Sequence, residues 1–181
     1  MSRREVTPTG REKLWNDADI IVSKTDLKGV ITYANDVFVN VCGYSEAELL
    51  GAPHSIIRHP SMPRCVFQYL WDTIEARHEV FAYVKNMSKS GDHYWVFAHV
   101  TPTFGPRGEI IGYHSSRRVP DRKAVETLEG IYQVLLAEEQ KYPRGPEQVQ
   151  AGLALLVKTL QGAGVTYDEF IWAQTTEAGV V

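Results

Sequence analysis

Arg58 and His59 are the residues best equipped for binding chemistry, two adjacent cationizable side chains in the stretch Ile-Ile-Arg-His-Pro-Ser-Met-Pro at residues 56–63. Pro60 disfavours helix at His59, and Pro63 suits the first turn of a helix, so both side chains are predicted to lie in a loop. A guanidinium presents a planar fork of donors to phosphate or carboxylate, and an imidazole can donate or accept. The stretch predicts a loop that presents both groups to a ligand, with a solvated surface loop as the alternative.

Composition and charge narrow the classes of protein. The chain has 181 residues, enough for one domain with an appendage, and a formal net charge of -3, which does not indicate binding to nucleic acid or to an anionic membrane. It has no run of about 18 apolar residues and no apolar region typical of a signal peptide, so neither a membrane span nor secretion is expected. Cys42 and Cys65 lack metal-ligand spacing and are expected to be free thiols in the cytoplasm.

The elements before the Arg58–His59 loop are predicted from β-branched runs and capping residues. Residues 20–22 and 30–34 flank a glycine-containing turn and predict a β-hairpin. Asn35 is predicted to cap a helix that ends at Gly43, and apolar residues at helical spacing after Pro63 predict a further helix.

The second half of the chain predicts three strands and then helices. Strand-like runs at 80–84, 94–101 and 110–115 alternate with polar turns, which is typical of an antiparallel meander. After Pro120, apolar residues recur at helical spacing to about residue 173.

We therefore expect an α+β fold with three parts. Residues 1–18 form an arm, disordered or loosely docked, with a helical stretch over 11–16. Residues 19–120 form a single domain, and residues 121–181 form a helical extension. The apolar faces of that extension need a partner, either the sheet or a second copy of the chain.

The order of elements and several short motifs together resemble a PAS domain over residues 20–118, in particular that of bacterial aerotaxis receptors. The resemblance implies a five-stranded antiparallel sheet with short helices on one face and non-covalent FAD held between them. It also implies redox or oxygen sensing, with the signal passed to a chemoreceptor or kinase. The motifs are Thr25-Asp26-Leu27, Tyr33-Ala34-Asn35-Asp36, Gly43-Tyr44-Ser45, Arg58-His59-Pro60, Met62-Pro63, Val84-Lys85-Asn86 and Gly91-Asp92-His93-Tyr94-Trp95.

Residue by residue, the resemblance assigns flavin contacts to five positions. An arginine can pair with pyrophosphate, a phenylalanine can pack on a ring system, and an asparagine can donate to and accept from a polar ring edge. Trp95 is expected to be either core or a cofactor wall, on one strand face with Phe97 and His99 toward a cavity. The five matched positions are Arg58, His59, Asn35, Phe67 and Asn86.

The chain also departs from the family pattern, and other functions stay open. Ser61 replaces an aspartate, and Val80 replaces a tryptophan whose ring would stack on the flavin. The receptor's membrane anchor and signalling coiled coil have no counterpart here, so the domain is expected to act in trans, as a homodimer. The alternatives to FAD are haem held by His78 and a cofactor-free dimerisation module. No catalytic motif is found, so the chain is not expected to be an enzyme.

Overall fold

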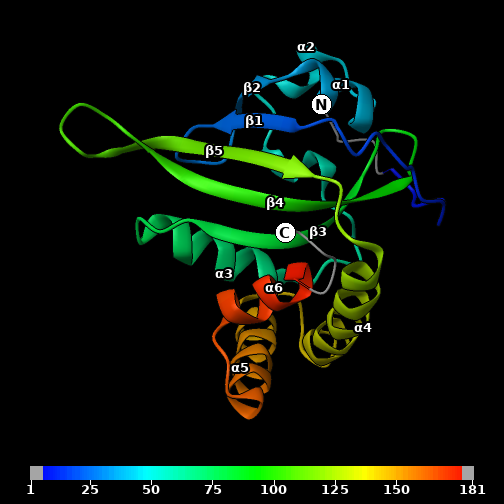
Figure 1. Ribbon diagram of the computed structural model, residues 1–181, viewed down its shortest axis with the longest axis vertical. Helices are drawn as coiled ribbons and strands as arrows, with labels where there is room; N and C mark the ends of the chain where they lie inside the picture. The colour runs from blue at the N-terminus through cyan, green and yellow to red at the C-terminus, as the bar shows by residue number, and fades with distance from the viewer. Residues whose placement is uncertain (1–5, 177–181) are drawn as a thin grey trace.

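The predicted five-stranded antiparallel sheet forms the centre of the protein, which is described by a computed structural model over residues 6–176. The strand order is β2-β1-β5-β4-β3, so the first hairpin joins the meander through the pairing of β1 with β5 (Figure 1). This is the architecture that the motif resemblance implies, and the predicted fold is confirmed. The strands are β1 (Ile21–Thr25), β2 (Ile31–Ala34), β3 (Val80–Met87), β4 (His93–Phe104) and β5 (Ile110–Arg118).

Short helices between β2 and β3 cover the inner face of this sheet. The capping signals predicted from the sequence are confirmed, because the Asn35 side chain accepts from the backbone N–H of Phe38 and Gly43 ends the first helix with a φ of 73°. Only glycine adopts that backbone conformation without a steric cost. The segments are α1 (Asp36–Cys42), α2 (Glu46–Leu49), the 3-10 helix η1 (His54–Ile57) and α3 (Arg64–Glu75).

The inner and outer faces of β4 are the reverse of those predicted. Val96, Ala98 and Val100 face the helices and the interior of the domain, whereas Trp95 and the next two odd-numbered side chains face away. Alternation along a strand groups residues onto faces but does not say which face is covered by which helices. The aromatic face is buried here by the C-terminal helices, which the sequence pattern of β4 does not reveal.

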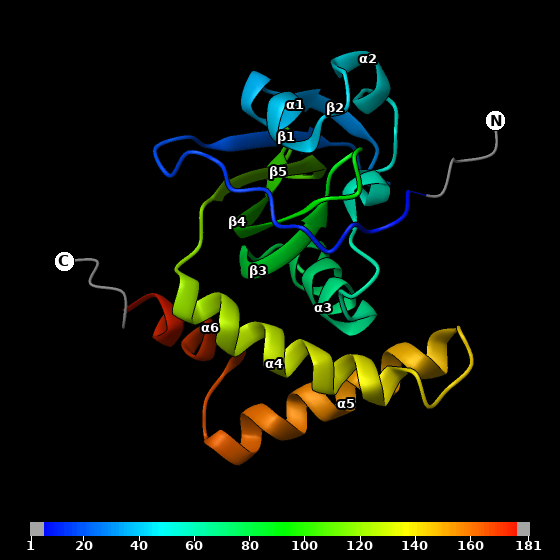
Figure 2. The same ribbon diagram turned by 90° about the vertical axis from the view of Figure 1, so that its right-hand side faces the viewer.

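The C-terminal extension consists of α4 (Arg122–Glu139), α5 (Pro146–Ala163) and α6 (Tyr167–Thr176), all on the β3 side of the molecule (Figure 1). On the outer face of the sheet, the hydroxyl of Tyr132 in α4 donates to the carbonyl of Tyr83 at 2.7 Å. The ring of Trp172 in α6 lies 4.7 Å from that of Phe81. Helix α5 packs against α3 and α4 (Figure 2). Of the two partners expected for the extension, the sheet or a second copy of the chain, the structure shows the sheet.

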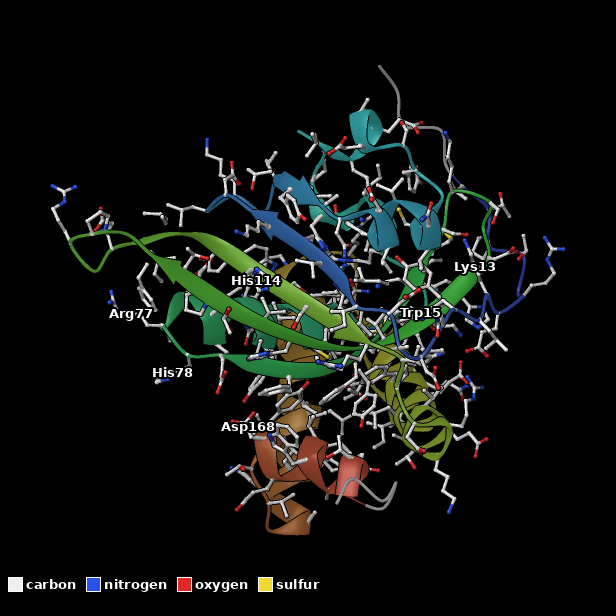
Figure 3. All side chains as sticks on the ribbon, turned by 45° about the horizontal axis from the view of Figure 1, so that its top comes forward. Lys13, Trp15, Arg77, His78, His114 and Asp168 are labelled. Atoms are coloured by element: carbon white, nitrogen blue, oxygen red, sulfur yellow. The ribbon has the colours of Figure 1, made fainter. Side chains whose placement is uncertain are left out.

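The N-terminal arm is extended rather than helical over residues 11–16, so the predicted helical stretch is wrong. The backbone N–H of Lys13 donates to the carbonyl of His93 at 2.7 Å, and the indole of Trp15 donates to the carbonyl of Trp95 at 3.3 Å (Figures 2 and 3). Both groups bond to the start of β4, and the backbone N–H of Lys13 is therefore not free to close a helical turn. Their partners lie about 80 residues away in sequence, beyond the reach of local patterns.

Two expectations about the described residues concern membrane-spanning helices and thiols. No helix among residues 6–176 combines the length and the apolar character needed to cross a membrane. Cys42 and Cys65 are both buried and unpaired, as expected for free thiols. Burial raises the pKa of each, so neither is activated as a nucleophile.

Candidate ligand-binding cavity

A cavity of about 370 Å³ lies between the inner face of the sheet and the helices η1 and α3. Its size falls in the range typical of small-molecule sites, which are concave and mostly apolar. The rings of Trp71 and Tyr113 meet edge to face at 5.4 Å and form an aromatic wall. Aliphatic side chains from the sheet and the helices supply the rest of the apolar lining: Ile57, Leu70, Ile74, Val84, Val96 and Val100.

The charged groups at the cavity are all basic. Lys28, Arg58 and Arg117 contribute to its wall together with two histidines, and no aspartate or glutamate of the described residues does. A buried cation without a counter-charge is costly, so such a wall favours a ligand that brings negative charge. The arrangement is suited to an anionic ligand with an aromatic or apolar body.

Three of the predicted site residues meet at this cavity. The guanidinium of half-buried Arg58 lies 3.8 Å from the centre of the Phe67 ring, a cation–π contact that orients its donors. Arg58 also forms a backbone bridge with Asn86 of β3, which holds the loop against the sheet. Arg58, Phe67 and Asn86 all line the cavity, so its wall carries a fork of donors, an aromatic face and an amide.

Arg117 is a site residue that the sequence reasoning missed. It is 2% exposed on the inner face of β5, and its guanidinium lies 4.6 Å from the centre of the Phe38 ring. Its Nη2 donates to the hydroxyl of Ser23, its Nη1 lies 3.5 Å from Nε2 of His54, and its Nε has no hydrogen-bond partner among the described residues. Burial lowers the pKa of Arg117 to about 10, so the side chain is charged at neutral pH.

His54 completes this polar group. Burial, reinforced by the charges of Arg117 and Arg58, lowers the pKa of His54 to about 3, so the ring is neutral at neutral pH. Its Nε2 also lies 3.2 Å from the hydroxyl of Ser23. The signal for Arg117 was present in the sequence as an arginine in phase with Tyr113 and Ser115 on one strand face.

The remaining predicted residues lie outside the cavity wall. The Asn35 amide is used by the backbone, since Oδ1 accepts from the N–H groups of Val22 and Phe38 and Nδ2 donates to the carbonyl of Ile20. Trp95 stacks at 6.2 Å on Tyr132 of α4, on the outer face of the sheet. Of the two roles expected for Trp95, the structure shows the core role, and its predicted place at the cavity is wrong.

His99 is likewise on the outer face, so its predicted place at the cavity is also wrong. Its ring stacks on Phe81 at 4.2 Å and its Nε2 lies 2.7 Å from a carboxylate oxygen of Glu79.

The His59 side chain is buried but does not line the cavity. Its Nδ1 accepts from the N–H of Ser61 at 3.1 Å and lies 2.7 Å from the Ser61 hydroxyl, so the residue that replaces the family's aspartate holds this ring. Burial lowers the pKa of His59 to about 4. These contacts of the His59 ring stabilise the loop that presents Arg58.

Val80 and His78 bear on the flavin and haem alternatives. Val80 is fully buried on the inner face of β3, opposite Val100, and the aromatic surface of the cavity comes from Phe67, Trp71 and Tyr113 instead. His78 follows α3 at the periphery of the molecule and does not line the cavity (Figure 3).

Comparison with known proteins gives a consistent result. Residues 31–117 match the family described as PAS fold. The chain is 41% identical over 121 residues to the aerotaxis receptor of Escherichia coli (strain K12), covering 67% of this chain and 24% of the receptor. It is 33% identical over 101 residues to the nitrogen fixation regulatory protein of Klebsiella pneumoniae, covering 56% and 20%. The chain thus matches about a quarter or less of these relatives' length.

Solved structures agree on the fold. The dark structure of the blue-light photoreceptor Aureochrome1 LOV superposes with a TM-score of 0.55 at 20% sequence identity, covering 63% of this chain and 85% of that one. A light-oxygen-voltage domain studied with a flavin analogue gives a TM-score of 0.54 at 18% identity, covering 62% and 84%. At this level of identity the likeness shows a shared fold.

Proposed function

Because residues 31–117 of this chain belong to the PAS fold family, we propose that it is a cytoplasmic sensor, not an enzyme, that holds FAD in the cavity between its sheet and α3. The observation that carries the proposal is a cavity with aromatic walls and basic side chains but no acidic side chain among the described residues. The similarity to the aerotaxis receptor adds redox or oxygen status as the signal.

The residues at the cavity are suited to separate tasks. Arg58, half-buried, and Lys28, exposed, are placed to bind phosphate oxygens near solvent. Phe67 and Trp71 offer ring faces for packing, and the Asn86 amide can donate to and accept from a polar ring edge. A bound flavin supplies a ring whose charge and protonation change with its oxidation state.

The C-terminal extension is the proposed output element. Lys85 of β3 pairs with Glu129 of α4 at 2.7 Å, one residue from Asn86 on the same strand, so inner and outer faces are connected over a short path. Val134 and Val157 remain exposed on α4 and α5 and offer apolar contacts to a second copy or to a chemoreceptor or kinase. We propose that a change at the cavity alters these contacts.

An absorption spectrum of the freshly purified protein tests the cofactor. Flavin absorbs in the blue, haem gives a strong Soret band, and a cofactor-free module gives neither. We expect a flavin spectrum, with FAD identified by mass after release. A protein that lacks blue absorption as purified and takes up no FAD on reconstitution would contradict the proposal, and a Soret band would replace it with the haem alternative.

A further inference from the structure

We propose that Arg117 binds the electron-rich edge of the ligand's ring and that its buried charge favours the reduced ligand. This inference rests on the proposed function, because it assigns the group that senses the oxidation state of a flavin bound in the same cavity. It differs from the assignment of Arg58, which concerns phosphate.

The position of Arg117 indicates a ligand partner. Its side chain is 2% exposed and lines the cavity, and its Nε is buried without a hydrogen-bond partner among the described residues. A purely structural buried arginine is normally paired with a carboxylate, because an unpaired buried donor or charge costs free energy. Here the cavity wall of the described residues has no carboxylate, so the compensating electron density must come from what occupies the cavity.

The burial of the three basic side chains indicates which of them contacts the ligand's ring and which contact its phosphates. Lys28 is exposed and Arg58 half-buried, whereas Arg117 is enclosed by Phe38 and the inner face of the sheet. A phosphate is strongly hydrated, so it is held at lower cost near solvent, while an aromatic ring gains from burial. The deep guanidinium is therefore assigned to ring heteroatoms, and the two outer cations to phosphate.

The neighbours of Arg117 orient the guanidinium without neutralising it. Ser23 accepts from Nη2, and Nε2 of His54 lies 3.5 Å from Nη1, where it can accept a hydrogen bond. His54 is neutral at pH 7 because burial lowers its pKa to about 3. Arg117, Ser23 and His54 together therefore carry one net positive charge, and the guanidinium that bears it is held in one orientation.

A fixed positive charge beside the ring changes the energetics of reduction. When a flavin takes two electrons from an external donor and one proton from water, the ring gains one negative charge. A cation in a low-dielectric site stabilises that charge, and charge near the ring is a recognised way for a protein to tune a flavin. Arg117 is therefore expected to raise the midpoint reduction potential.

The test compares Arg117→Gln with Arg118→Gln, the next residue on β5, which is exposed. Dissociation constants are measured for riboflavin, which lacks phosphate, and for FAD, and midpoint potentials are measured during titration with dithionite. We expect Arg117→Gln to weaken both ligands by a similar factor of about tenfold and to shift the midpoint potential to a more negative value. Arg118→Gln should match the wild type in all three measurements.

Several outcomes would overturn the inference. Weaker FAD binding with unchanged riboflavin binding would show that Arg117 contacts the phosphate and not the ring. An unchanged midpoint potential would show that its charge does not favour the reduced ligand. If Arg117→Gln does not fold, Arg117→Lys retains the charge and should weaken riboflavin while keeping the potential near that of the wild type; unchanged riboflavin affinity in that variant would contradict the contact. A wild-type protein that binds neither ligand would instead refute the proposed function, and with it this inference.

Discussion

Two arginines reach the same cavity at different depths, and their neighbours differ accordingly. Arg58 lies in a loop, stacked on Phe67, where solvent can screen its charge. Arg117 lies on a strand with its donors directed by Ser23 and His54, away from solvent. Because a charge interaction strengthens as water is excluded, the deeper arginine responds more strongly to the charge of a ligand.

Replacing Arg58 with alanine is expected to weaken FAD binding by about 1.5–3 kcal/mol, the usual value of a hydrogen bond to a charged group. Riboflavin, without phosphate, should lose much less. Fluorescence titration of both ligands measures the difference, with Arg107→Ala, whose side chain is 90% exposed in the β4–β5 hairpin, as the control. Equal FAD affinity in the Arg58 variant and the wild type would contradict the assignment.

The buried histidines predict a loss of stability in mild acid. Burial lowers the pKa of His59 to about 4, below the ordinary 6.5. Between pH 6.5 and 4 the unfolded chain binds a proton at this histidine that the folded chain does not. The free energy of unfolding therefore decreases as the pH decreases, by at most about 1.4 kcal/mol per pH unit for each such histidine. Stability from this source is complete above pH 6.5 and lost as pH falls toward 4.

The variant His59→Asn tests this pH dependence. The amide oxygen of the introduced asparagine can still accept from the N–H of Ser61, but the amide does not titrate. Urea unfolding at several values between pH 4 and 7 should give a flatter dependence than in the wild type. An unchanged slope would show that His59 is not the source.

At the scale of elements, α4 and α3 are connected by a buried carboxylate. Glu139, with no exposed surface, accepts from the backbone N–H groups of Arg64 at 3.0 Å and Cys65 at 2.7 Å, the first two residues of α3. A negative charge at a helix N-terminus satisfies free donors and interacts favourably with the helix dipole. Gly152 of α5 allows this approach, since a Cβ there would lie 2.8 Å from a Glu139 oxygen.

Replacing Glu139 with leucine is expected to lower the unfolding free energy by about 1–3 kcal/mol for each buried donor left without a partner. Glu138→Leu is the matched control, because Glu138 pairs with the exposed side chain of Lys141, an interaction that contributes little. Thermal melting of the two variants beside the wild type measures the effect. If both variants melt alike, Glu139 is not what holds the extension to α3.

For the molecule as a whole, the C-terminal extension covers the aromatic outer face of the sheet. Tyr132 stacks on Trp95, and Trp172 packs against Phe81 and Phe97. Burial of apolar surface contributes roughly 25 cal/mol per Å². Removal of the extension would leave several aromatic side chains together in water, and such patches drive association.

A chain that ends at Arg118 is therefore expected to melt at a lower temperature and to aggregate or change its oligomeric state. Light scattering and thermal melting measure both properties, and the full chain is the control. A shortened chain with the same subunit count and the same melting temperature would show that the extension is dispensable and that the proposed output route is wrong.

Local patterns in the sequence predicted most of the helices and strands, and they placed one residue of the site, Arg58, in a loop. The caps at Asn35 and Gly43 depend on neighbours within a few residues, and so do the strand alternation and the loop at Arg58. The motif resemblance added the joining of the five strands into one antiparallel sheet and the placement of Phe67 and Asn86 at the cavity.

Which strand face becomes the interior was decided only by tertiary structure. Trp95 and Val96 alternate in the same way whichever side the helices take, and the side was set by the packing of α4 and α6 on the aromatic face. Arg117 meets Ser23 and His54 across 94 and 63 residues of chain. No local pattern indicates that this arginine is buried without a carboxylate, because burial and charge pairing depend on which distant elements come together.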